Sequence, residues 1–261
     1  MAAFYLYEGL ILRIMKSVYI TCFSLFLLCG CDNSTINKAA HNNDVAETKI
    51  KVTSHEDQVV LHAPGWGEMQ FELPEPGTYE LPPFGEAADG NVLTSDGEEK
   101  RLSDFYGDKI VILSFIYTQC SDLNGCPLVT AVFYKLKEAL KDNPELSNKL
   151  RLISLSFDPK YDTPEVMKFY GQGSEDFGGA EWQFLTTASQ EELNPIINSF
   201  GQFVNQEYDD EGNPTNKFAH ILRVFLIDKN GVKRSQYSAS FLHDQSLIAD
   251  VKTLIMEEHD S

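Results

Sequence analysis

The feature that most constrains the fold is a nearly continuous apolar run at residues 110–116, which a helical pattern follows after a short loop. A run of this kind is typical of a strand buried on both faces of a sheet. A second run at 150–157 precedes Asp162, Thr163 and Pro164, which indicate the start of a helix that continues through Tyr170. Alternation of strands and helices predicts an α/β domain with parallel strands at the centre of its sheet.

Shorter apolar runs and turn residues predict the remaining elements. Residues 58–84 are interrupted by prolines and glycines and predict short strands or an extended arm. The other predictions are a hairpin at 91–102 that turns at Asp96 and Gly97, a strand at 182–186, a helix from Ser189 towards Phe200, a hairpin of strands 221–227 and 232–237, and a final helix from Asp244 to about Met256.

The loop after the first buried run carries two cysteines, Cys120 and Cys126. Pro127 predicts that a helix begins at the second cysteine, and a thiol near a helix N-terminus is favoured as thiolate, the form that attacks disulfides and binds metals. Asn124 and Gly125 favour a tight turn between the cysteines. An inert structural disulfide is the simplest alternative, and the spacing of the two residues does not exclude it.

The N-terminus has the features of an export signal. Lys16 precedes an apolar run at 18–28 that leads to Cys31, in a segment that resembles the lipobox of bacterial lipoproteins. We therefore expect a signal peptide at 1–31, lipid on Cys31 and, because aspartate follows, retention at the periplasmic face of the inner membrane. An uncleaved membrane span is the alternative, although the run is shorter than the roughly 20 residues that a span needs.

The rest of the chain divides by composition. Residues 32–57 are polar without a hydrophobic period and predict a flexible tether. The arm and first hairpin then occupy 58–101, and the main domain occupies 102–261. The formal net charge of −18 would repel phosphate backbones, so nucleic acid is not expected as a partner.

Several separated segments between residue 102 and the C-terminus resemble the Sco/SenC family of copper chaperones from bacterial and mitochondrial membranes. These segments are FIYT at 115–118, Cys126 with Pro127, SLSFDP at 154–159 with DTP at 162–164, and a histidine shortly before the VFLID strand at 224–228. The resemblance implies a thioredoxin-like fold, in which helices flank a central mixed sheet, with the N-terminal extended or β arm as an addition.

The same resemblance implies a copper-binding site. Family members bind one copper through two cysteines and a histidine, which correspond here to Cys120, Cys126 and His220, with the cysteines also forming a redox pair. Two thiolates suit Cu(I), and an imidazole also suits Cu(II), whereas zinc is the alternative metal for such ligands. The family usually has three residues between its cysteines, and this chain has five, 121–125.

The implied function is assembly of a copper site in a client such as a respiratory oxidase subunit or another exported cuproenzyme, which is a protein-handling role more than substrate turnover. A periplasmic thiol–disulfide oxidoreductase is the alternative, but a Cys-x-x-Cys motif would be expected for it. A thiol peroxidase of this fold would need Thr or Ser where Tyr117 stands. We interpret Asp162 as a helix cap, whereas Asp158 suits either a turn or a site-facing role. The other histidines are interpreted as ordinary solvated residues: His41, His55, His62, His243 and His259.

Overall fold

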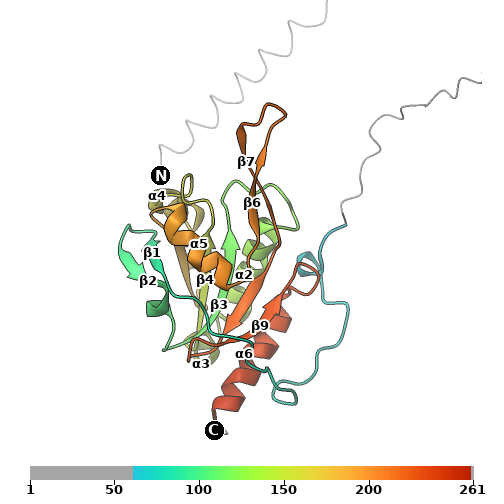
Figure 1. Cartoon of the computed structure of the whole chain (residues 1–261). Helices are drawn as coiled ribbons and strands as arrows, with labels where there is room; N and C mark the ends of the chain where they lie inside the picture. Colours follow the sequence, from blue (N-terminus) through green and yellow to red (C-terminus); the bar gives the residue numbers. More distant parts are fainter. Residues whose placement is uncertain (1–60, 260–261) are drawn as a thin grey trace, which may run out of the picture. The chain divides into compact units, whose positions relative to one another are not determined.

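The computed structural model describes residues 61–259, in which a mixed sheet is flanked by helices (Figure 1). The strand order is β2-β1-β5-β4-β3-β8-β9. Its members are β1 (Asn91–Thr94), β2 (Glu99–Arg101), β3 (Ile110–Ile116), β4 (Leu150–Ser156), β5 (Glu181–Thr186), β8 (Val224–Ile227) and β9 (Lys233–Tyr237).

The centre of the sheet confirms the prediction from the two apolar runs. Every residue of β3 and β4 is buried, and the two strands pair in parallel, as β4 does with β5. Strand β8 pairs with β3 in the antiparallel direction, and β1 does the same with β5, so the sheet is mixed. The hairpin predicted around Asp96 and Gly97 is confirmed, and its strand β1 joins the main sheet.

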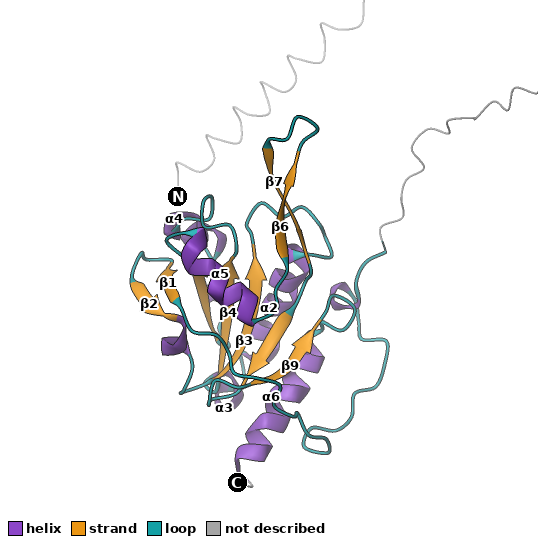
Figure 2. Cartoon of the chain, in the orientation of Figure 1, coloured by secondary structure: helices purple, strands orange, loops and turns teal. Residues whose placement is uncertain are grey.

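Helices lie on both faces of the sheet (Figure 2). Phe133 in α2 packs against Trp182 on one face, and Phe200, just after α5, packs against Phe115 on the other. Helix α2 has Pro127 in its first turn and an apolar face towards the sheet, as its sequence predicts. The helices are α2 (Cys126–Leu140), α3 (Pro144–Ser147), α4 (Pro164–Tyr170), α5 (Gln190–Ser199) and α6 (Asp244–His259), with 3-10 turns η1 (Pro64–Trp66), η2 (Leu102–Phe105) and η3 (Ser174–Phe177).

A second, two-stranded sheet was not predicted from the sequence. Strands β6 (Val204–Tyr208) and β7 (Pro214–His220) pair with each other in a ribbon that extends beyond the end of the main sheet (Figure 1). The predicted strand at 221–227 consequently begins later, at Val224. The ribbon escaped prediction because its residues are mostly exposed and polar, so they lack the alternation that marks a half-buried strand.

The arm is extended and, between residues 61 and 84, its regular structure is limited to η1. This part packs on α2, where the Lys135 ammonium donates hydrogen bonds to the carbonyls of Gly65 (2.8 Å) and Trp66 (3.2 Å). A β-carbon on Gly65 would lie 2.4 Å from the carbonyl oxygen of Leu242 and 2.8 Å from Val132 Cγ2. The close packing therefore requires glycine at this position, and it fixes the arm to the body of the domain.

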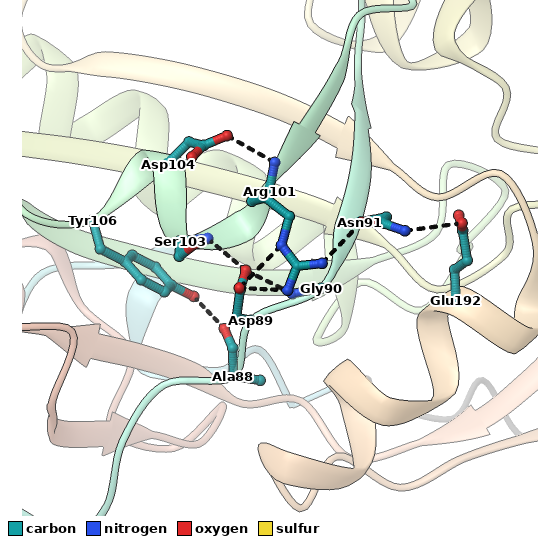
Figure 3. Close-up of polar contacts among 9 residues, drawn as sticks. All are labelled: Ala88, Asp89, Gly90, Asn91, Arg101, Ser103, Asp104, Tyr106 and Glu192. Atoms are coloured by element: carbon teal, nitrogen blue, oxygen red, sulfur yellow. Dashed lines mark hydrogen bonds and ion pairs between the residues drawn. The ribbon is translucent and has the colours of Figure 1, made fainter.

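Polar contacts join the first hairpin to its surroundings (Figure 3). Arg101 donates to the Asp89 carboxylate through Nε (3.0 Å) and Nη2 (2.5 Å), and to Asn91 Oδ1 through Nη1 (3.0 Å). The Asn91 amide in turn donates to Glu192 in α5. Against the opposing effect of burial, the hydrogen bonds from Arg101 and from Ser103 lower the pKa of Asp89 to about 2. The network connects the edge of the sheet to the helix that covers it.

An ion-pair cluster at the start of β5 gives a prediction on acid stability. Glu181 accepts hydrogen bonds from Lys109 (2.7 Å) and pairs with Arg151 (3.1 Å). Against the opposing effect of burial, these partners lower the pKa of Glu181 to about 2. A lowered folded-state pKa means that the carboxylate stabilises the fold above its unfolded pKa and that this contribution disappears as the pH falls to about 2.

We therefore expect Glu181→Gln to lower the free energy of unfolding by about 1 kcal/mol at pH 7, since the partly exposed pair is screened by solvent. The difference from the wild type should shrink as the pH falls below about 4.5. Urea denaturation at several pH values measures this difference in the free energy of unfolding. The control is Glu99→Gln, at an exposed position of β2. A difference that stays constant down to pH 3 would contradict the assignment.

Some sequence predictions lie outside the described residues: the signal peptide at 1–31 with Cys31, the tether at 32–57 with His41 and His55, and the side chain of His259. Within 61–259, no helix combines the length and the apolar character needed to cross a membrane.

Candidate metal centre

The structure brings Cys120, Cys126 and His220 together. Cys120 lies in the loop after β3, Cys126 is the first residue of α2, and His220 is the last residue of β7. One ligand atom from each residue lies within 4.8 Å of the others, and Cys126 Sγ is 3.8 Å from His220 Nε2. Both cysteines are free thiols. The cluster is therefore arranged to hold one metal ion.

The register of two neighbouring strands brings the histidine to the cysteines. Ser114 near the end of β3 pairs with Val224 at the start of β8, and the strands run in opposite directions. The segment that leaves β3 and the segment that enters β8 therefore meet at the same edge of the sheet. Cys120 lies four residues beyond β3 and His220 four residues before β8, so the two side chains converge.

A hydrogen bond orients the imidazole. His220 Nδ1 lies 3.3 Å from the carbonyl oxygen of Phe218, which accepts a hydrogen bond and so assigns the proton to Nδ1. Nε2, which faces Cys126, is then left with its lone pair for a metal. A backbone carbonyl on the second ring nitrogen is the usual support of a metal-binding histidine.

Aromatic rings surround the histidine. The ring centroids of Phe157 and Tyr117 lie 5.0 Å and 5.8 Å from that of His220, and Phe218 packs against both of them. Burial and the nearby Cys120 raise the pKa of Tyr117, so this residue is a neutral phenol at neutral pH. The sequence did not predict these rings as part of the site, although Tyr117 belongs to the FIYT segment that carries the family resemblance. Phe218 lies in the strand that the sequence did not predict.

The two thiols differ in environment. A hydrogen bond from the Cys126 thiol lowers the pKa of Cys120 to about 6 against the effect of burial, and the backbone N–H groups of Cys126 and Asp122 add to this. The same thiol hydrogen bond, together with burial, raises the pKa of Cys126 well above its usual value. The helix N-terminus therefore stabilises the thiolate of Cys120, which is partly exposed, whereas Cys126 is only 1% exposed.

This difference predicts the order of chemical modification. In the metal-free chain, iodoacetamide should alkylate Cys120 with a rate that rises through a pKa of about 6, while Cys126 reacts far more slowly. Peptide mapping by mass spectrometry distinguishes the two sites. Cys126→Ala removes the thiol donor and should shift the inflection for Cys120 to higher pH. Equal reactivity of both thiols at pH 7 would contradict this assignment.

The loop between the cysteines forms a compact turn. The N–H of Gly125 donates to the carbonyl of Asp122 (2.9 Å), and the Asp122 carboxylate accepts from the N–H of Asn124 (3.0 Å). A β-carbon on Gly125 would lie 3.2 Å from Cys120 Sγ. The turn predicted from Asn124 and Gly125 is therefore present, and its five residues keep the two thiols close.

The interpretation of Asp162 as a helix cap is wrong. The cap of α4 is Thr163, whose hydroxyl accepts from the N–H of Val166. Asp162 is instead fully buried and accepts hydrogen bonds from the Thr118 N–H (3.1 Å), the Thr118 hydroxyl (2.5 Å) and the Ser156 hydroxyl (2.5 Å). It connects the end of β3, two residues before Cys120, to the end of β4.

The other candidates lie outside the cluster. His62 is an exposed residue of the arm. His243 is not solvated as expected, because it is buried just before α6, where its Nε2 lies 3.3 Å from the carbonyl oxygen of Gly67. Asp158 is half-buried, and burial together with the neighbouring charge of Asp162 raises its pKa.

Comparison with known proteins gives a family and a fold. The chain is 26% identical over 191 residues to the SCO1 protein homolog of Bacillus subtilis (strain 168), which covers 70% of this chain and 86% of the relative. A solved SCO1/SenC family lipoprotein from Bacillus anthracis is 25% identical, with a TM-score of 0.54, 66% of this chain covered and 95% of that one. Arabidopsis thaliana ScoI, solved with copper bound, is 22% identical, with a TM-score of 0.52 and coverage of 66% and 98%.

These likenesses confirm the thioredoxin-like fold predicted from the sequence, with its mixed sheet and flanking helices. A model of the SCO1/SenC family matches residues 88–256, which is more than half of the chain and includes all three residues of the cluster. The chain therefore belongs to the SCO1/SenC family.

Proposed function

We propose that this protein binds one copper ion through Cys120, Cys126 and His220 and helps to assemble the copper site of a respiratory oxidase or another exported cuproenzyme. The observation that carries the proposal is the convergence of two thiols and one imidazole within 4.8 Å at the end of the sheet. Copper is the cargo in this role, and the protein acts on another protein instead of turning over a small substrate.

The ligand set suits copper in both oxidation states. Two thiolates prefer the soft Cu(I) ion, and the imidazole adds a ligand that also suits Cu(II). Cys120 has a lowered pKa and is therefore available as thiolate at neutral pH, whereas Cys126 must lose its proton as the metal binds. A disulfide between the two cysteines would remove both sulfur ligands, so copper binding depends on the redox state of the pair.

A thiol–disulfide oxidoreductase is the second candidate, and the asymmetric thiols favour it. A partly exposed cysteine with a pKa of about 6 beside a buried one is the arrangement of an attacking and a resolving thiol. Such a reductase would act on the cysteines of a client protein in the periplasm.

Attachment to the inner membrane through lipid on Cys31, facing the periplasm, is part of the proposal. The lipobox-like segment before Cys31 supports it, and the Bacillus anthracis relative is described as a lipoprotein. Cys31→Ser should release the protein from isolated membranes upon washing. Retention of that variant in the membrane fraction would favour an uncleaved span.

One titration separates the two functions. The full chain carrying Cys22→Ser, Cys29→Ser and Cys31→Ser, here called the two-cysteine chain, is reduced and titrated with Cu(I) under anaerobic conditions against a competing chelator. We expect one Cu(I) per chain, and zinc at equal concentration should not displace it. A chain that binds no copper but rapidly reduces the disulfides of insulin would instead be an oxidoreductase.

A further inference from the structure

The beginning of the arm contacts the loop between the two cysteines. Asn124 accepts a hydrogen bond from the N–H of Ala63 (2.8 Å) and donates one to the carbonyl of Leu61 (2.9 Å). The Trp66 indole donates to the carbonyl of Leu123 (3.0 Å). These three hydrogen bonds between residues 61–66 and residues 123–124, called the clasp below, join segments about 60 positions apart in the sequence.

The arm side of the clasp is held firmly. Lys135, on the third turn of α2, binds the carbonyls of Gly65 and Trp66, and Gly65 is packed too closely against Leu242 and Val132 to accept a side chain. Since α2 begins at Cys126, one end of the clasp is attached to the helix that carries a thiol. Its other end reaches the loop that leads back to Cys120.

The loop needs such support because it is two residues longer than the usual loop of the family. A longer loop has more conformations, and ordering them upon metal binding lowers affinity unless the loop is ordered beforehand. The turn from Asp122 to Gly125 fixes the local path of the loop, but it does not fix the loop against the domain. The clasp supplies that connection through the side chain of Asn124 and the carbonyl of Leu123.

We propose that Asn124 is a positioning residue, which holds the cysteine loop against the arm so that the Cys120 thiol stays beside Cys126 and His220. This inference rests on the proposed copper function. Asn124 itself lies outside the ligand cluster and acts through the loop. The lengthened loop and the N-terminal arm, which are distant in the sequence, thereby act together to position the Cys120 thiol.

Two variants weaken the clasp from opposite sides, and both leave the hydrogen bond from Trp66 to Leu123 in place. Asn124→Ala removes both side-chain hydrogen bonds from the loop. Ala63→Pro removes one of the two donors on the arm, the Ala63 N–H, and the backbone of Ala63, with φ −64° and ψ 152°, already has the conformation of proline. Gln70→Ala, in the exposed part of the arm beyond the clasp, is the matched control. All variants are made in the two-cysteine chain, and the apo forms are compared by thermal unfolding.

Ala63→Pro, which removes one hydrogen bond of the clasp, should bind Cu(I) about tenfold more weakly than the parent chain, and Asn124→Ala, which removes two, should lose at least as much affinity. The double variant should be no weaker than Asn124→Ala alone, because Asn124→Ala already removes the acceptor of the Ala63 N–H. Alkylation of the buried Cys126 in the metal-free chain should become faster in the variants, and Gln70→Ala should change neither quantity. The midpoint of apo unfolding should stay close to that of the parent chain, because the clasp lies at the edge of the domain.

The outcomes separate this inference from the proposed function. If the parent chain binds Cu(I) and the variants bind it equally well, the inference is wrong while the copper function stands. Losses that multiply in the double variant would also overturn it, since the two residues would then act independently. If the parent chain binds no copper, the proposed function fails, and unchanged alkylation of Cys126 in the variants would overturn the clasp as well.

Discussion

Replacing Cys126 with serine in the two-cysteine chain should lower the affinity for Cu(I) by more than about 100-fold, because even removing a group that only supports a metal ligand costs about 10- to 100-fold. A hydroxyl of similar size does not provide the soft thiolate that Cu(I) prefers. The residue is buried at the first position of α2, so no other thiol among the described residues can take its place. Competition with a chelator of known affinity measures the effect.

Two further variants make this result specific. His220→Ala should keep Cu(I) on the two thiols but lose tight binding of Cu(II), which visible absorption of the Cu(II) form would report. Gln70→Ala, in the exposed part of the arm beyond the clasp, is the control and should bind copper as the parent chain does. A Cys126→Ser variant that binds Cu(I) normally would exclude the cluster as the copper site.

The second large effect is expected on stability. Asp162→Ala should lower the free energy of unfolding by about 4 kcal/mol, since it leaves buried donors without an acceptor and removes hydrogen bonds to a charged group. The affected donors are the N–H and hydroxyl of Thr118 and the hydroxyl of Ser156. Because Thr118 lies two residues before Cys120, copper affinity should also fall. Chemical denaturation with and without Cu(I) measures both effects.

Asp158→Asn is the matched control for this prediction. Burial and the charge of Asp162 raise the pKa of Asp158, so ionising this carboxyl is less favourable in the folded state than in the unfolded chain, and the contribution of its protonated form to stability is lost as the pH rises. Replacing this carboxylate with a neutral amide should therefore cost nothing at pH 7, or stabilise the protein slightly. Equal losses in Asp158→Asn and Asp162→Ala would indicate a general effect of negative charge in the loop instead of specific hydrogen bonds.

The sequence predicted the elements whose signals are local. The apolar runs of β3 and β4, the proline at the start of α2 and the Ser189 cap of α5 each act over a few residues, and the structure has all of them where they were expected. The predicted group Cys120, Cys126 and His220 came from a resemblance to a family. The structure places these residues close together, but their positions in the sequence alone would not have predicted that they meet.

What the sequence did not predict depends on partners far away in the chain. Asp162 has the local pattern of a helix cap, yet its hydrogen-bond donors include Thr118, which is 44 positions away. The β6–β7 ribbon is polar because it buries little surface, so it has no periodic signal. The sequence predicts Asn124 only as a turn residue. Its contacts with the arm could not be predicted, because its partners Ala63 and Leu61 lie 61 and 63 positions earlier in the chain.

The pairing of β3 with β8 also has a consequence for the order of events during folding. Cys120 and Cys126 are neighbours from the moment the loop forms, whereas His220 lies 94 positions from Cys126 and reaches it only after a distant strand has joined the sheet in register. Closing such a large loop is slow compared with forming a turn or a helix. A copper ion that arrives early in folding would therefore meet a dithiol alone, and the third ligand becomes available only when the central sheet is complete.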